Sequence, residues 1–244
     1  MIKLKTTSKI LLFMLAILVV LYIVVAIFGA VSNKNILVSE ADDILNINAQ
    51  GIADASNYVN TDLVSDISAD DNIWGDMNAP IQMIVYEDLS NTYSAEFSKV
   101  IDKVEQEYAG KVVIAFRHYA LKSFSLSIPS SLAVECANDQ GRFTDMRDIL
   151  ISKTESNELN EEDFSSYAKD LSLNIDEFNT CLQNKKYLGK VTKQTESANG
   201  FDVFGTPTIF INKELVVGAR PWDDFTTQDE EKVEGIKTII NRHI

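Results

Sequence analysis

The sequence predicts an α/β domain that carries a helical insertion, and three observations lead to this class. Two β-branched, apolar segments, 81–86 and 111–119, flank a segment whose apolar residues recur at spacings of three and four. That order is typical of a parallel strand–helix–strand crossover. The pattern from about 125 to 197 is helical. Beyond it, a turn at 205–207 leads into a β-branched run that returns as an antiparallel hairpin.

The N-terminal part predicts a membrane anchor. Residues 10–31 are apolar and carry no charge, and about 20 such residues span a bilayer as a helix. Lysines precede this run and acidic residues dominate after it, so residues 1–9 are expected in the cytoplasm and the rest on the extracytoplasmic side. The alternative is a cleaved signal peptide, whose apolar core is normally ~7–15 residues. We therefore expect a single-pass protein of the cell membrane.

The next segment, residues 32–71, is polar and acidic with only scattered apolar residues. We expect it to be a largely exposed tether that holds the following domain away from the membrane. The whole chain has a formal net charge of −14. An acidic domain of this kind argues against nucleic acid or an anionic lipid surface as its partner.

The expected globular part runs over 72–244. The segment 81–86 is nearly all apolar, as expected of a strand that is covered on both faces. A helix should follow and end at Gly110, and Ser90, Asn91 or Ser94 could each cap its start at roughly 1 kcal/mol.

The insertion should contain four helical segments, with their apolar residues near 132–136, 143–150, 164–171 and 178–182. The chain has two cysteines, Cys136 and Cys181, which excludes a Cys-x-x-Cys pair and a four-cysteine zinc site. Only His118 and His243 could supply imidazole, and His118 is expected to be an ordinary, hydrogen-bonded histidine. On this ligand count we expect no metal and no cofactor.

The C-terminal part predicts a hairpin and a final helix. A strand over 208–212 is followed by a turn at Lys213 and Glu214 and a returning strand over 215–218. The last helix is predicted to open at Pro221 and Trp222. Its buried face should consist of Phe225, Val233, Ile236, Ile239 and Ile240.

Several dispersed motifs then suggest a family. They are Trp74-Gly75 with Asn78-Ala79-Pro80, the stretch 135–143 around Cys136, the stretch 178–182 around Cys181, and Gly205-Thr206-Pro207-Thr208. Together they resemble the DsbA-like, membrane-anchored branch of thioredoxin-fold disulfide oxidoreductases. The resemblance covers about 72–244. It implies a thioredoxin-like fold with the insertion at about 125–197 and a cis-proline at Pro207.

In that family the cis-proline loop faces a Cys-x-x-Cys motif at the start of the first helix. Here Asn-Thr-Tyr-Ser stands in its place, so Asn91 and Ser94 occupy the two cysteine positions. Thiol–disulfide exchange needs a thiolate that attacks and a second thiol that resolves the mixed disulfide. An amide and an alcohol cannot form that couple. We therefore expect no catalytic residue at this site.

Peptide binding could remain without this chemistry. In thioredoxin-like domains the residue before the cis-proline, here Thr206, offers its backbone to an extended polypeptide, as in strand-type docking. The groove would lie between Asn91-Thr92-Tyr93 and Thr206-Pro207, with Tyr93 and Phe204 as apolar walls. The partner would be an extended polypeptide or a partner protein. The alternative is that this chain is a relative of the family that binds no ligand at this position.

Two enzymatic alternatives also stay open. The chain could still act as a thiol–disulfide oxidoreductase, or Ser94 could polarise a bound thiol as in glutathione transferases of similar fold. Cys136 and Cys181 are expected to form a structural disulfide, which an oxidising compartment permits. It would close a loop of about 45 residues, at ~3–4 kcal/mol. Two buried free thiols are the alternative.

Overall fold

The structure is a computed structural model, and it describes residues 61–121, 124–201, 203, 205–228 and 230–244. Contacts divide the chain into Met1–Asn57 and Tyr58–Ile244, and all described residues belong to the second unit. The predicted membrane anchor at 10–31 lies outside them. Within the described residues, no helix combines the length and the apolar character that a membrane crossing requires.

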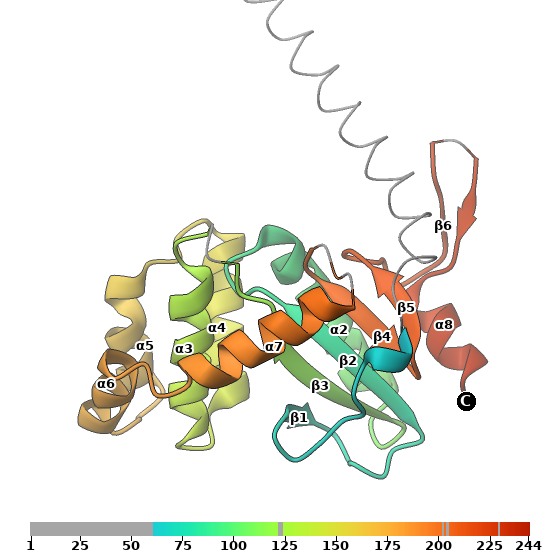
Figure 1. Ribbon diagram of the computed structural model, residues 1–244. Helices are drawn as coiled ribbons and strands as arrows, with labels where there is room; N and C mark the ends of the chain where they lie inside the picture. Colours follow the sequence, from blue (N-terminus) through green and yellow to red (C-terminus); the bar gives the residue numbers. More distant parts are fainter. Residues whose placement is uncertain (1–60, 122–123, 202, 204, 229) are drawn as a thin grey trace, which may run out of the picture. The chain divides into compact units, whose positions relative to one another are not determined.

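A five-stranded sheet forms the centre of the domain (Figure 1), in the order β1-β3-β2-β4-β5. The predicted crossover is present: β2 and β3 pair in parallel, and helix α2 connects them. The other neighbouring strands pair antiparallel. The bounds are β1 Asn72–Trp74, β2 Ile81–Glu87, α2 Thr92–Glu107, β3 Val112–His118, β4 Thr208–Ile211 and β5 Glu214–Val217.

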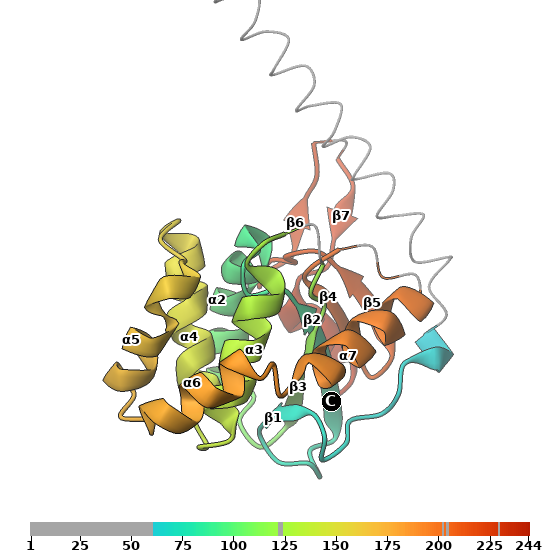
Figure 2. The same cartoon turned by 60° about the vertical axis from the view of Figure 1, so that its left-hand side comes forward.

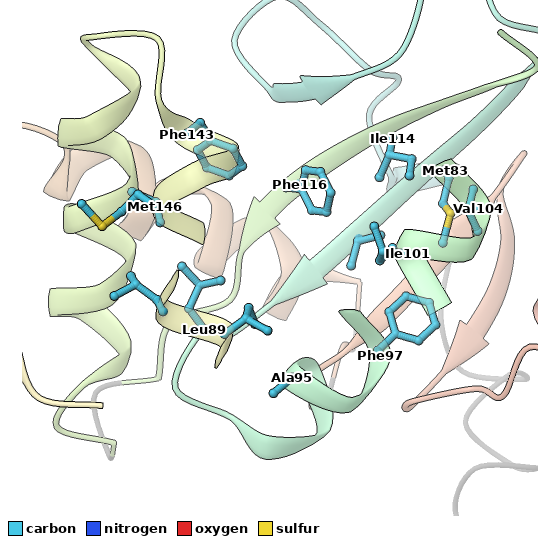
Figure 3. Packing of buried hydrophobic residues seen from close by; sticks show 14 of the residues in the cluster. Met83, Leu89, Ala95, Phe97, Ile101, Val104, Ile114, Phe116, Phe143 and Met146 are labelled. Carbon is cyan, nitrogen blue, oxygen red and sulfur yellow. The ribbon is translucent and has the colours of Figure 1, made fainter. Parts of the chain in front are cut away.

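Both faces of the sheet are covered, as the apolar sequence of 81–86 predicts. Met83 and Val85 of β2 belong to the main core, which α2 and the insertion share (Figure 3). The alternate residues Ile84 and Tyr86 pack on the opposite face, where Ala198 of α7 contributes to a second cluster. Successive side chains of a strand point to opposite faces of the sheet, so the unbroken apolar run reflects a strand that is buried on both faces.

The insertion is helical, as predicted, and Figure 2 shows its helices α3, α4, α5 and α6 gathered at one side of the sheet. Helix α7 returns from the insertion and contacts β3. It adds a fifth helix to the four predicted segments. The bounds are α3 Ser127–Asn138, α4 Phe143–Glu155, α5 Phe164–Asp170, α6 Ile175–Gln183 and α7 Leu188–Gly200, with short 3₁₀ turns η1 at Thr61–Leu63 and η2 at Glu161–Asp163.

The C-terminal hairpin turns one residue earlier than predicted. Asn212 and Lys213 are the turn residues, with φ of 46° and 70°, and Glu214 already lies in β5. A two-residue hairpin turn whose twist matches that of the flanking strands requires two consecutive residues in the left-handed conformation. Asparagine tolerates this conformation well, so Asn212 fixes the position of the turn.

The predicted final helix from Pro221 onward is wrong in its first half. Helix α8 spans only Ile236–Arg242. Phe225 and Val233 lie instead in a separate two-stranded hairpin, β6 Phe225–Thr226 and β7 Lys232–Val233, and Phe225 is 37% exposed. The residues between the two strands are polar, and the N–H of Thr227 donates to the carbonyl of Glu231 at 2.9 Å. Phe225 and Val233 therefore lie on paired strands and not on one face of a helix.

The domain makes contacts before its predicted start at residue 72. Val64 is buried, and the Arg117 side chain of β3 binds the segment that precedes β1. Its nitrogens donate to the carboxylate of Asp71 at 2.7 and 2.9 Å and to the carbonyls of Ser65 and Asp66 at 3.0 and 3.1 Å. The last part of the predicted tether is therefore fastened to the sheet by the Asp71 carboxylate, by two backbone carbonyls and by the buried Val64, although most of its other side chains are exposed.

Candidate functional site

The start of helix α2 is closed by Asn91. Its side-chain oxygen accepts a hydrogen bond from the backbone N–H of Tyr93 at 2.8 Å, and its own backbone is extended, with φ −99° and ψ 129°. This is the geometry of an N-cap, which satisfies a donor that the helix leaves free. Among the three capping candidates, the structure selects Asn91. At residue 91, where the family resemblance predicts the attacking sulfur, this chain has an amide that is bound to the backbone.

Ser94, in the first turn of α2, points inward. It is 1% exposed, and its Oγ accepts a hydrogen bond from the backbone N–H of Asp88 at 3.3 Å. The hydroxyl thus connects the helix to the loop that follows β2. A thiol arriving from solvent does not meet this buried oxygen, so the geometry does not favour the transferase alternative.

Two residues between these positions face solvent. Thr92 is exposed, and Tyr93 is among the exposed large side chains of the domain, with 59% of its surface accessible. Their backbone belongs to the first turn of α2, whereas their side chains are available to a ligand. Isolated exposed aromatic residues are common on protein surfaces, so Tyr93 matters here only because of what lies beside it.

The turn at Thr206 and Pro207 lies beside the start of α2. Thr208 pairs with Tyr86 near the end of β2, which places the proline turn next to the loop that leads into α2. The Thr206–Pro207 bond is cis, and the carbonyl of the buried Pro207 accepts from Gly218 N–H at 2.9 Å. Both sides of the predicted groove therefore come to the same end of the sheet. Phe204, its other predicted wall, lies outside the described residues.

Thr206 itself is half-buried. The ladder between β2 and β4 ends at the pair Tyr86 and Thr208, two residues beyond Thr206. The N–H and C=O of Thr206 form no hydrogen bond with any other residue in the part of the chain that the structure describes. This backbone is the kind of group that an added strand uses.

Beneath the loop lies a buried carboxylate that sequence reasoning missed. Asp88 is 3% exposed, and its Oδ1 accepts from the N–H and the hydroxyl of Ser90 at 2.9 and 2.7 Å. Its Oδ2 accepts from the hydroxyl of Ser127 at the start of α3. These bonds hold the site loop against the insertion. The available signal was an acidic pair, Glu87 and Asp88, placed directly after an apolar strand.

The other member of that pair forms a buried ion pair. Both carboxylate oxygens of Glu87 accept from Arg147 of α4 at 2.8 Å, and both side chains are almost fully buried. Burial disfavours the charged guanidinium, but Glu87, with smaller contributions from Asp148 and Glu105, more than offsets this and raises the pKa of Arg147. The arginine also lies over the ring of Phe116, 4.3 Å from its centroid. The pair joins the insertion to the end of β2.

A second polar cluster surrounds His118 at the end of β3. His118 Nε2 and Glu135 Oε1 are 2.7 Å apart, and Glu135 also accepts from Asn72 and from Lys190. Burial acts to raise the pKa of Glu135, but the hydrogen bond and charge of His118, together with Asn72 and Lys190, lower it to about 2. His118 is thus held inside a structural cluster, as the sequence predicts for an ordinary histidine.

Both cysteines of the chain lie in the insertion. Cys136 of α3 and Cys181 of α6 are joined in a disulfide, with Cα atoms 5.8 Å apart, and no free cysteine remains. Both residues are buried. In the part of the chain that the structure describes, no three His, Cys, Asp or Glu side chains are grouped so that they could hold a metal ion.

Comparison with known proteins identifies the family of this architecture. The sequence model of a family described as Thioredoxin matches residues 68–231. Among curated proteins, a Na(+)/H(+) antiporter NhaA 3 of Salinispora tropica is 28% identical over 153 residues, which cover 62% of this chain and 23% of the antiporter. An NhaA 1 of Mycolicibacterium gilvum is also 28% identical, over 63% of this chain and 25% of that protein. The chain thus spans about a quarter of the length of these relatives.

Solved structures share the fold. BdbD from Bacillus subtilis, in its oxidised form, superposes with a TM-score of 0.59 at 19% identity and covers 73% of this chain and 95% of its own. α-DsbA1 from Wolbachia pipientis gives a TM-score of 0.58 at 22% identity and covers 75% and 94%. These similarities show a DsbA-like fold, including the helical insertion.

Proposed function

Because this chain belongs to the thioredoxin family, we propose that its DsbA-like domain binds an extended polypeptide at the start of α2 and performs no thiol–disulfide exchange there. One observation carries the proposal: the start of α2 and the cis-proline turn lie at the same end of the sheet, but neither contains a cysteine. Asn91 is engaged as a helix cap, Ser94 is buried, and both cysteines are bonded to each other in the insertion. An amide and an alcohol cannot take up or release the electron pair of a disulfide.

The binding surface consists of groups that need no thiol. Thr206 presents backbone groups that no described residue occupies, and Tyr93 presents an exposed ring at the same end of the sheet. An extended chain would gain its affinity from main-chain hydrogen bonds to Thr206 and its selectivity from side-chain contacts. Aromatic residues such as Tyr93 often contribute strongly at interfaces of this kind.

The same proposal includes a location. Residues 10–31 would anchor the protein in the cell membrane, with the domain on the extracytoplasmic side. The Cys136–Cys181 bond fits that side, because disulfides persist in oxidising compartments and are rare in the cytosol. The partner would be a polypeptide or protein reached from the membrane surface.

A redox assay tests the catalytic half of the proposal. We expect the full-length protein to reduce insulin no faster than the uncatalysed reaction. The matched variant Asn91→Cys/Ser94→Cys places a Cys-x-x-Cys at the start of α2, where the helix dipole and free N–H groups favour a thiolate, and should gain activity. Turnover by the natural protein that persists in Cys136→Ser/Cys181→Ser would overturn the proposal.

A binding assay tests the other half. Fluorescence anisotropy with a labelled, unstructured peptide that lacks cysteine should show saturable binding. Tyr93→Ala should weaken it by about 5–10-fold, the range of a moderate interface contact. Leu63→Ala is the matched control, since Leu63 is similarly exposed at 56% but lies before β1, outside the proposed site. Equal affinity of the Tyr93→Ala variant and the natural protein would place the peptide elsewhere.

A further inference from the structure

The hairpin formed by β6 and β7 has no role in the site described so far. It stands apart from the five-stranded sheet and projects from the domain in both views (Figures 1 and 2). The sequence predicted Phe225 and Val233 on a buried helix face, yet Phe225 is exposed and Val233 is only half-buried. A hairpin that buries so little apolar surface adds little to the stability of the fold. An exposed hairpin of this kind is suited to a role in recognition.

The base of the hairpin follows the segment that binds the proline turn. Pro207 is bound through its carbonyl to Gly218, and two residues later Arg220 donates to the carbonyl of Glu234 at 3.1 Å. Asp224 accepts from the N–H of Gly235 at 2.9 Å. A Cβ at Gly235 would lie 2.5 Å from the Trp222 carbonyl oxygen, so only glycine fits this close approach. The hairpin is thus fixed to the chain that continues from β5, whose Gly218 binds the proline turn.

Each strand of the hairpin has an unpaired edge. In the described part of the chain the sheet contains only β6 and β7, so each strand has a partner on one side alone. Unpaired strand edges are templates for the backbone of another chain, and proteins usually shorten or charge them to prevent indiscriminate pairing. Both devices are present here, since the strands are short and the surrounding side chains are charged.

The charge of the hairpin selects its partner. Asp223, Asp224, Glu230 and Glu231 are exposed, and Lys232 is the one exposed base among the described residues from 223 to 234. Glu230 and Glu231 form no ion pair with a described residue. The chain as a whole is acidic, with a net charge of −14. A segment with lysine or arginine side chains complements this surface, whereas an anionic lipid surface does not.

We propose that the β6–β7 hairpin is a docking arm that pairs through a free edge with an extended, basic polypeptide segment and continues the binding site from Thr206. The inference rests on the proposed function and adds to it the chemical class of the ligand. The backbone edge supplies affinity for any extended chain. The acidic side chains give preference to a basic one.

The test uses the full-length protein in non-ionic detergent with two unstructured peptides. They share the same apolar residues, but one contains lysines where the other contains glutamates. A photoreactive phenylalanine analogue replaces Thr226 on the hairpin or, in a second protein, Thr92 at the start of α2. We expect the lysine peptide to crosslink at both positions, and the glutamate peptide to crosslink weakly.

Charge reversal provides the matched variants. Glu230→Lys/Glu231→Lys should weaken binding of the lysine peptide by about 10-fold at low salt, with a smaller effect at high salt, where exposed charges are screened. Glu161→Lys/Glu162→Lys is the control, because it changes the same charge at exposed positions of the insertion. Equal effects of the two reversals would mean that only total charge matters, and would overturn the docking arm.

The outcomes separate the two proposals. Crosslinking at Thr92 but not at Thr226, with no effect of the hairpin reversal, would overturn the docking arm and leave the proposed function intact. Crosslinking at neither position by either peptide would overturn both. Crosslinking at Thr226 alone would contradict the proposed site at the start of α2 and a binding surface that continues from Thr206.

Discussion

The start of helix α2 and the helical insertion are held in place by different kinds of interaction. The loop at α2 is held by hydrogen bonds of Asn91, Ser94 and Asp88, and it leaves Thr92 and Tyr93 in solvent. The insertion is held by the Cys136–Cys181 disulfide and by the buried pair of Arg147 with Glu87. Stability is therefore concentrated in the insertion, and accessibility in the loop.

This difference indicates a division of labour. A support that carries the large stabilising interactions can hold a surface whose own interactions are weak. Substitutions in the insertion should then lower the free energy of unfolding strongly with little effect on peptide affinity. Substitutions at the start of α2 should do the reverse.

The largest effect is expected for Arg147→Met. It leaves the carboxylate of Glu87 buried without its partner, which should lower the free energy of unfolding by about 3–5 kcal/mol. Urea denaturation followed by circular dichroism measures the change. The double variant Glu87→Gln/Arg147→Met should recover part of the loss, because no buried charge then remains. A double variant that is less stable than Arg147→Met would contradict this explanation.

Removal of the disulfide should rank next. Cys136→Ser/Cys181→Ser opens a loop with a sequence separation of 45 and should lower the free energy of unfolding by roughly 3–4 kcal/mol. The two buried sulfurs lie in α3 and α6, away from Thr206, so peptide affinity should stay within about twofold once the variant is folded. A large loss of affinity in the folded variant would show that the two regions are coupled.

Acid should weaken the insertion through Glu135. Its folded pKa of about 2 lies below the ordinary value of 4.5, so the carboxylate stabilises the fold above pH 4.5 and loses this contribution as the pH falls toward 2. The difference corresponds to about 3 kcal/mol. Unfolding measured across this window should show a slope that Glu135→Gln reduces. An unchanged slope in that variant would assign the acid sensitivity to other carboxylates.

The smallest effect is expected at the site itself. Asn91→Ala removes the cap of α2 and should lower the free energy of unfolding by about 1 kcal/mol. Asn91→Ser, which can cap in the same way, should restore most of it. A loss as large as that of Arg147→Met would contradict the proposed division between the two regions.

The sequence was most informative where a local pattern had one physical meaning. The apolar run of β2, the spacing in α2 and the helical segments of the insertion all predicted their elements, because strand and helix periods differ clearly. The cap at Asn91 was predictable as one of three candidates. The proline turn and the α2 start could be brought together only through the family resemblance, since no local pattern reports a contact between residues 115 positions apart.

The incorrect or missed predictions concern residues whose structure is determined by contacts with distant parts of the chain. Phe225 and Val233 have a helical spacing from α8, but polar residues and a turn separate them and place them in a hairpin. The acidic pair Glu87 and Asp88 marked the end of the apolar strand, but it did not show that Asp88 is buried, because its partner Ser127 comes from the distant helix α3. Arg117 similarly gave no sign that it would bind the chain before β1.

The bonds of Arg117 have a mechanical consequence. A force applied to the chain before residue 61 would reach the sheet at two places, because Arg117 of β3 holds Ser65, Asp66 and Asp71 and Val64 packs with Phe210 of β4. Asp66 also lies 3.5 Å from Lys213 in the turn between β4 and β5. Tension would therefore be shared between β3 and β4, and a pull that detached this segment would also act on the strand that follows the proline turn.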